Sequence, residues 1–152
     1  MLIVRRMTEA DIDVVSELEC SAFSDSWSKR SIQDTLESGS SIVLVAEKDE
    51  EIIGYCISYS VLDEAEIARI AVSTSCRRQG VGCKLIDSLV KICEEKEVSH
   101  LMLEVREGNV AARMFYQAYG FGVDGIRKKY YQSPVEDAVL MSMRIPTVPT
   151  RN

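Results

Sequence analysis

The amino-acid sequence predicts an α+β domain built on a mixed β-sheet. The first half holds three β-branched, apolar segments separated by short charged turns, the pattern of an antiparallel meander. In the second half an amphipathic helical pattern lies between two strand patterns, which indicates a β-helix-β crossover to a parallel strand. With 152 residues, the chain has the length of one ordinary domain. We therefore expect residues 1–145 to form a single domain, with about six to seven strands flanked by about four helices.

The N-terminal region is expected to form a short strand over 3–5 and then two helices. Thr8, with Asp11 three residues later, resembles a capping box that opens the first helix. The apolar residues that follow keep the spacing of one helix face: Ile12, Val15, Leu18 and Ala22. Ser28 is suited to cap the second helix, and Gly39 is expected to end it.

The meander is expected to follow directly. Its strands are predicted over 41–46, 52–61 and 67–72, because these segments are rich in β-branched and aromatic residues. Charged residues at 48–51 and acidic residues at 63–66 are expected to form the two turns.

Helical and strand patterns alternate in the rest of the chain. Residues 80–97 carry apolar side chains at helical spacing, and 100–105 alternate, with Leu101, Leu103 and Val105 on one face. A further helix is expected to open at Asn109 or Glu107 and to end at Gly120. Two closing strands are predicted over 121–127 and 138–145, joined by residues 128–137, and the Pro- and Thr-rich tail 146–152 is expected to be flexible.

Charge and composition exclude several classes of protein. The net charge of −6 opposes binding to nucleic-acid phosphates and favours cationic partners, including basic peptides. Five cysteines form no C-x-x-C pair and His100 is the only histidine, so neither a disulfide framework nor a metal site is predicted. Free thiols, apolar runs too short to span a membrane and an N-terminus unlike a signal peptide favour a cytoplasmic protein.

The segment from Arg77 to Cys83 has the features of a phosphate-binding turn. Gly80 and Gly82 allow the backbone to approach a ligand closely, and the helix that follows directs its N-terminal amides and dipole at an anion. Arg77 and Arg78 add positive charge beside it. A P-loop and a dinucleotide-binding fingerprint both fail, because the required lysine and third glycine are missing. From these residues alone, a plain helix start with a basic surface turn remains an alternative.

Two motifs together resemble the GNAT family of N-acetyltransferases. Ile70-Ala71-Val72, a short loop and Arg77-Arg78-Gln79-Gly80-Val81-Gly82 are similar to the family's acetyl-CoA motif. Asn109-Val110-Ala111-Ala112, followed by Phe115-Tyr116 and Tyr119-Gly120-Phe121, is similar to its second motif, in the family's order and spacing. The resemblance implies a splayed sheet that holds acetyl-CoA between the third meander strand and the strand carrying Glu104. It implies that residues 70–72, 77–83 and Asn109 contact this co-substrate, with no metal.

Further residues resemble the ribosomal-protein-alanine (RimI-type) acetyltransferases and related archaeal and eukaryotic enzymes that acetylate protein N-termini. These are Ser26-Trp27-Ser28, Leu103-Glu104-Val105-Arg106, Arg127-Lys128 with Tyr130-Tyr131, and Glu136-Asp137-Ala138. The resemblance covers nearly the whole chain and implies that the substrate is a protein or peptide N-terminus, ribosomal proteins included. A GNAT enzyme that acetylates a small amine or a lysine, and a non-catalytic CoA-binding module, are the alternatives. The sequence does not specify the oligomeric state.

The resemblance also implies roles for individual side chains. Glu104 would act as general base, and a carboxylate in a partly apolar cleft suits that role because desolvation raises its pKa. Tyr116 would protonate the leaving thiolate. Ion pairing of Glu104 with Arg106 or a lysine, and simple core packing of Tyr116, are the structural alternatives. Trp27, Tyr130 and Tyr131 are candidates for the wall of the substrate side, or for packing over the core.

Overall fold

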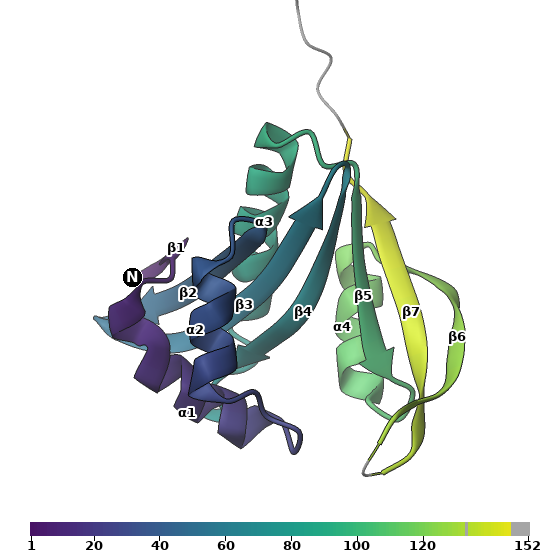
Figure 1. The fold of residues 1–152 in the computed structure, drawn as a ribbon, viewed down its shortest axis with the longest axis horizontal. Helices are drawn as coiled ribbons and strands as arrows, with labels where there is room; N and C mark the ends of the chain where they lie inside the picture. The colour runs from purple at the N-terminus through teal and green to yellow at the C-terminus, as the bar shows by residue number, and fades with distance from the viewer. Residues whose placement is uncertain (133, 147–152) are drawn as a thin grey trace, which may run out of the picture.

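The computed structural model describes residues 1–132 and 134–146. A seven-stranded mixed sheet runs through this part of the chain in the order β1-β2-β3-β4-β5-β7-β6 (Figure 1). This confirms the predicted fold class. Residues 147–152 of the tail expected to be flexible lie outside the described residues. The elements are β1 (Leu2–Arg6), α1 (Ile12–Ala22), α2 (Lys29–Glu37), β2 (Ser41–Lys48), β3 (Glu51–Val61), β4 (Glu64–Val72), α3 (Val81–Glu95), β5 (His100–Arg106), α4 (Val110–Tyr119), β6 (Gly122–Tyr131) and β7 (Glu136–Arg144).

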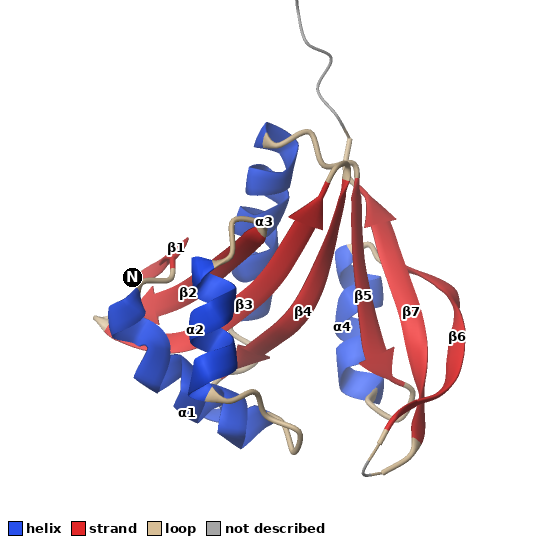
Figure 2. Ribbon diagram, viewed as in Figure 1, coloured by secondary structure: helices blue, strands red, loops and turns tan. Residues whose placement is uncertain are grey.

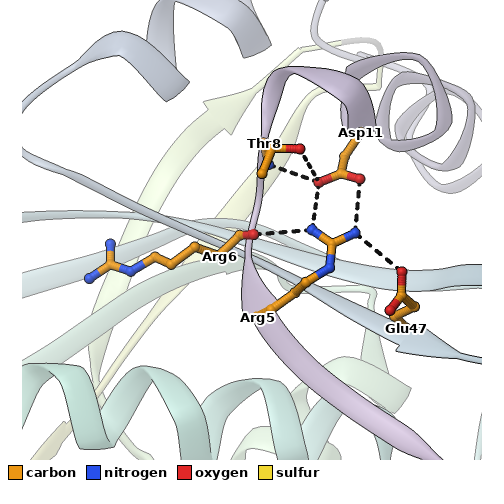
Figure 3. A network of polar contacts seen from close by, with 5 residues as sticks. All are labelled: Arg5, Arg6, Thr8, Asp11 and Glu47. Carbon is orange, nitrogen blue, oxygen red and sulfur yellow. Dashed lines mark hydrogen bonds and ion pairs between the residues drawn. The ribbon is translucent and has the colours of Figure 1, made fainter. Parts of the chain in front are cut away.

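The start of α1 is held to the sheet by a polar network around Asp11 (Figure 3). The Thr8 backbone N–H donates to Asp11 Oδ2 over 2.8 Å, as the predicted capping box requires. Arg5 of β1 donates to both oxygens of the same carboxylate, over 2.8 and 3.0 Å, and its Nη2 also reaches Glu47 of β2 over 3.3 Å. The network therefore ties the first helical turn to two strands at once.

Helices cover both faces of the sheet (Figure 2). On one, the α1–α2 face, Val15 and Ile32 pack against strand residues such as Tyr55 and Ile57. On the other, the α3–α4 face, a larger apolar cluster packs α3 and α4 against β2–β5 and β7. The apolar alternation of β5 follows from this layering, because Leu101, Leu103 and Val105 are all buried in the α3–α4 cluster. In the described residues, no helix is both long and apolar enough to cross a membrane.

The sheet splits between its two parallel strands, β4 and β5 (Figure 1). They pair only from Glu64↔His100 to Ile67↔Leu103, and their C-terminal halves diverge. A β-bulge at Ala68 falls where pairing stops, because Ile67 pairs with Ser58 while Arg69 pairs with the adjacent Ile57. The splayed sheet expected from the family resemblance is therefore present.

Three details differ from the expectations. The turn placed at 63–66 is shorter, because β4 begins at Glu64, where alternating exposed and buried residues already pair with β3. Strand β6 runs to Tyr131, so much of the expected connection 128–137 belongs to the sheet. Helix α2 ends at Glu37 with an extended Ser38, and Gly39 does not provide a left-handed cap. In the first two cases polar residues lie in strands, because pairing with a neighbouring strand and not local composition decides that the chain is extended.

Candidate active site

A cleft of about 910 Å³ lies where β4 and β5 diverge. Five segments distant in sequence line it: the α1–α2 connection, β4, β5, α4 with its N-cap, and the end of β6. Seven of the predicted site residues meet there: Trp27, Ile70, Glu104, Asn109, Tyr116, Tyr130 and Tyr131. The gap between the strands thus brings the predicted catalytic pair and the predicted substrate wall into one cavity.

The two predicted catalytic residues come from opposite faces of the sheet. Met102 pairs with Glu66, which pairs with Tyr59 on the α1–α2 face, so Glu104, two residues beyond Met102, also points to that face. Tyr116 belongs to α4 and packs in the α3–α4 cluster. The two side chains therefore reach the same cleft from opposite faces of the sheet.

Glu104 is mostly buried, at 19% exposure, and forms an ion pair with Arg127 of β6. Arg127 Nη1 lies 3.4 Å from Glu104 Oε1. The alternative partner considered from the sequence, Arg106, instead pairs with Glu136 and donates to the carbonyls of Gln132 and Pro134. The Glu104 carboxylate thus has a surface arginine as its counter-ion.

Glu66 is a second carboxylate in the cleft, at a position where the sequence predicts an acidic turn. Partial burial raises its pKa, and the charge of Glu104 raises it further, while Arg127 acts in the opposite direction. The E-A-E alternation from Glu64 to Glu66 was the available signal for a strand carrying outward carboxylates.

Tyr116 is 7% exposed and sits edge-on to two phenylalanines, Phe115 and Phe121. Burial raises the pKa of its phenol well above the usual value, so the hydroxyl stays protonated at neutral pH. Tyr116 therefore packs in the core and also lines the cleft, so core packing and a role in catalysis are compatible at this residue.

The aromatic wall of the cleft comes from two segments. Tyr130 and Tyr131 lie at the end of β6 with ring centroids 5.0 Å apart, where the register with β7 shifts. Arg127 lies over Tyr130 and Arg106 over Tyr131, at 5.0 and 4.5 Å from the ring centroids. The Glu104 carboxylate raises the pKa of Tyr130, and burial raises that of Tyr131 to about 12. Trp27, in the α1–α2 connection, lines the same cleft.

The glycine turn before α3 lies on the α3–α4 face, outside the residues that line the cleft. Gly80 caps the helix in the left-handed region, with φ of 80°. Gly82 abuts α4, where an added Cβ would lie 3.0 Å from Phe115 Cζ. The Gly80 carbonyl accepts from Lys84, so the amides of residues 81–83 precede the first helical hydrogen bond. Gln79 accepts from Lys48 of β2 over 3.4 Å.

The remaining predicted contacts lie along β4 and at the start of α4. Ser73 N donates to Ile53 O, and backbone direction alternates along a strand, so the amides of Ile70 and Val72 face the open side while Ala71 faces β3. This geometry favours Val72 over Ala71 for contact with a ligand in the gap. Asn109 caps α4, its side chain accepting from Ala112 N over 3.2 Å, which leaves its amide N–H group for another partner.

The sheet splits between two parallel strands, with a glycine turn on one face and a carboxylate on the other. This arrangement is that of an acyl-group transferase that brings two substrates together from opposite sides. The chain belongs to the GNAT acetyltransferase family, whose model matches residues 12–121, and it is an acetyl-CoA-dependent N-acetyltransferase.

Named relatives and a solved structure agree with this assignment. A protein of Bacillus subtilis (strain 168) with the provisional name ribosomal protein bS18-alanine N-acetyltransferase is 41% identical over 143 residues, which cover 93% of this chain and 95% of that protein. The ribosomal protein bS18-alanine N-acetyltransferase of Haemophilus influenzae (strain ATCC 51907 / DSM 11121 / KW20 / Rd) is 34% identical, covering 93% and 98%. The crystal structure of the ribosomal-protein-S18-alanine N-acetyltransferase from Escherichia coli superposes with a TM-score of 0.90 at 28% identity, covering 100% and 98%.

Proposed function

We propose that this enzyme transfers the acetyl group of acetyl-CoA directly to the α-amino group of a protein N-terminus, with a ribosomal protein that begins with alanine as the substrate class. The observation that carries the proposal is the two-sided cleft, with Glu104 on the α1–α2 face and Tyr116 from the α3–α4 face. Relatives named ribosomal protein bS18-alanine N-acetyltransferases support the choice of substrate.

The coenzyme side of the cleft is assigned to the α3–α4 face. The amides of residues 81–83, with the helix dipole behind them, would hold the pyrophosphate, and Arg77 and Arg78 would add positive charge. The Val72 amide faces the gap and would polarise the thioester carbonyl. The Asn109 amide would hold the pantetheine arm. Acetyl-CoA supplies an activated acetyl group, which is why the chain itself needs no covalent acetyl carrier.

The general base would come from the α1–α2 face and the general acid from the α3–α4 face. Glu104 would accept the proton of the substrate ammonium, directly or through water, and the free amine would attack the thioester carbon. Tyr116 would give its proton to the departing thiolate. Its phenol is protonated at neutral pH, as this role requires, while burial makes it a weaker acid than a free tyrosine. The ammonium loses two protons on becoming an amide. Glu104 takes the first and passes it to solvent as the net proton released; the second is lost as the tetrahedral adduct collapses and the carbon–sulfur bond breaks, and it restores through solvent the proton that Tyr116 delivers to sulfur.

The peptide side would be the α1–α2 face. Glu66 and Glu104 present negative charge to an ammonium group, and Trp27, Tyr130 and Tyr131 form an aromatic surround. An α-amino group has a pKa near about 8, against about 10 for lysine, so a single carboxylate base serves it more easily. Free thiols at all five cysteines accord with the reducing cytoplasm in which such substrates are made.

Two peptides test the substrate assignment. One has a free N-terminal alanine and no lysine, and the other has a blocked N-terminus and one internal lysine. Thiol release from acetyl-CoA is expected with the first and not with the second. Equal or faster turnover of the blocked lysine peptide would overturn the N-terminal assignment while leaving the acetyltransferase assignment intact.

A further inference from the structure

The most deeply buried charge in the described chain is not part of the catalytic pair. Glu19 of α1 is 0% exposed. Its carboxylate accepts from the Trp27 backbone N–H over 2.8 Å and from the Tyr55 hydroxyl, and it forms an ion pair with Arg69 Nη2 at 3.0 Å. One side chain thus joins α1, the α1–α2 connection, β3 and β4.

Arg69 of β4 also contacts the α1–α2 connection. Its Nη2 donates to the Asp25 carbonyl over 2.7 Å, and its guanidinium lies 4.3 Å from the Phe23 ring centroid and 5.4 Å from that of Trp27. Arg69, Phe23, Asp25 and Trp27 all line the cleft. The guanidinium is therefore enclosed by the residues that form one wall of the substrate side.

The β-bulge at Ala68 is what directs Arg69 to this position. In a regular strand Arg69 would share a face with Ile67, which is buried in the α3–α4 cluster. The extra residue reverses the alternation, and Arg69 pairs with Ile57 on the α1–α2 face. The same bulge marks the point where β4 leaves β5, so the opening of the cleft and the placement of Arg69 share one cause.

Stability alone does not explain this arrangement. Removing two charges from water costs about as much as their attraction returns, so buried ion pairs are seldom net stabilising. In addition, Arg69 Nε is buried and has no hydrogen-bond partner within residues 1–132 and 134–146. By contrast, the pair fixes a connecting segment: between α1 and α2, Trp27 is attached through Glu19 and Asp25 through Arg69.

We propose that the Glu19–Arg69 pair is a positioning device for the acceptor substrate: it holds residues 23–27 rigidly as the wall against which the peptide N-terminus is aligned with Glu104. The proposal rests on the proposed function. Arg69 acts here through the wall, as a positioning residue, and the coenzyme side on the opposite face is independent of it.

The test uses Arg69→Met, which keeps the apolar stem but removes the guanidinium, and Arg69→Lys, which keeps the charge but lacks the planar fork. Arg30→Met is the matched control, because Arg30 lies on α2 with 88% of its side chain exposed. For Arg69→Met, kcat/KM for a free-alanine peptide is expected to fall about ten- to a hundredfold through misplacement of the peptide, with KM for acetyl-CoA unchanged. The kcat/KM of Arg69→Lys for the same peptide should lie between those of Arg69→Met and the wild type, and that of Arg30→Met should equal the wild-type value.

Trp27 gives a second readout, because it is the only tryptophan in the chain. Its fluorescence emission should shift to longer wavelength in Arg69→Met and Arg69→Lys, as the loosened wall admits water, and should be unchanged in Arg30→Met. If Arg69→Met does not fold, Arg69→Lys carries the test. The proposal is overturned if a folded Arg69 variant has the wild-type kcat/KM for the peptide. It is also overturned if kcat/KM falls equally for acetyl-CoA and for the peptide. A wild-type enzyme that acetylates no peptide N-terminus would instead reject the proposed function.

Discussion

Arg127 forms an ion pair with Glu104, the proposed base, with Nη1 3.4 Å from Oε1. The arginine is 53% exposed and lies over the Tyr130 ring, whereas Glu104 is only 19% exposed. An incoming substrate ammonium and Arg127 would therefore compete for the same carboxylate. Because the arginine side chain is exposed, it can yield to the substrate at little cost.

Replacing Arg127 by Met is expected to lower the peptide KM by about two- to fivefold, since a partly exposed competing charge contributes little more than this. Steady-state kinetics at low salt measure the effect, which should diminish at high salt. Lys128→Met is the control, because Lys128 pairs with Asp137 outside the cleft. A higher peptide KM in Arg127→Met would show that the arginine binds the substrate instead of competing with it.

Glu104→Gln keeps the side-chain volume but removes the basic oxygen. Activity toward a free-alanine peptide should be mostly lost at neutral pH and should partly recover above about pH 8, where the α-amine deprotonates without help. The pH profile of kcat/KM measures this. Glu107→Gln, in the exposed turn that follows β5, should retain the wild-type profile. An unchanged profile in Glu104→Gln would remove this residue from the role of base.

Tyr116→Phe is expected to lower kcat by about ten- to ten-thousandfold, a range that includes the hundred- to ten-thousandfold effect typical of one positioned proton donor. The ring and its contacts with Phe115 and Phe121 remain, so acetyl-CoA affinity and the melting temperature should change little. Tyr119→Phe on the same helix is the control, because its hydroxyl donates to Asp87 at the surface. Full activity in Tyr116→Phe would leave solvent as the proton source.

Gly82→Val is expected to weaken acetyl-CoA binding. A Cβ at this position would lie 3.0 Å from Phe115 Cζ, so either the ring or the turn must shift, and the branched side chain would block close approach of the phosphate to the amides. Calorimetric titration with acetyl-CoA measures the loss. Gly122→Val is the control, because no atom lies within 4 Å of its added Cβ. Unchanged affinity in a folded Gly82→Val protein would place the pyrophosphate elsewhere.

Asp11→Asn should destabilise the fold in a pH-dependent manner. The hydrogen bond from Arg5 lowers the pKa of Asp11 in the folded chain, so its stabilisation is complete above about pH 4 and is lost as the pH falls through the lowered value. At pH 7 the variant should lose roughly 1–2 kcal/mol of unfolding free energy, after allowance for the partly exposed Arg5. Denaturant unfolding at pH 7 and pH 2.5 measures this difference. A loss of equal size at both values would mean that the charge of Asp11 contributes nothing.

Most of the fold could be predicted from local patterns. Caps at Ser28 and Asn109, the alternation of β5 and the helical spacing after Gly80 each act within a few residues, so the sequence reports them directly. Besides the end of α2, the differences fall where polar residues belong to strands, at Glu64–Glu66 and at the end of β6. In both places the pairing partner, not the local composition, decides that the chain is extended.

The candidate site also contains residues that local sequence patterns predict and residues that they do not. Glu104, Tyr116 and the glycine turn were found from motifs, but Glu66, Arg69, Glu19 and Arg127 were not assigned to the site. Glu19, Arg69 and Arg127 lie in a helix and two strands that the sequence predicts, whereas Glu66 lies where it predicts a turn. The partners of all four side chains are supplied by other elements. A side chain's partner depends on which segments become neighbours, and local sequence carries no direct signal of that.

By itself, the sequence determined the chemical inventory and the order of helices and strands, because caps, turns and periodicity are local properties. Only the tertiary structure decided that β7 lies between β5 and β6, that β4 and β5 part after Ile67, and that Ala68 bulges. The physical reason is that side chains alternate along a strand: one extra residue turned Arg69 from the α3–α4 face to the α1–α2 face, where Glu19 lies.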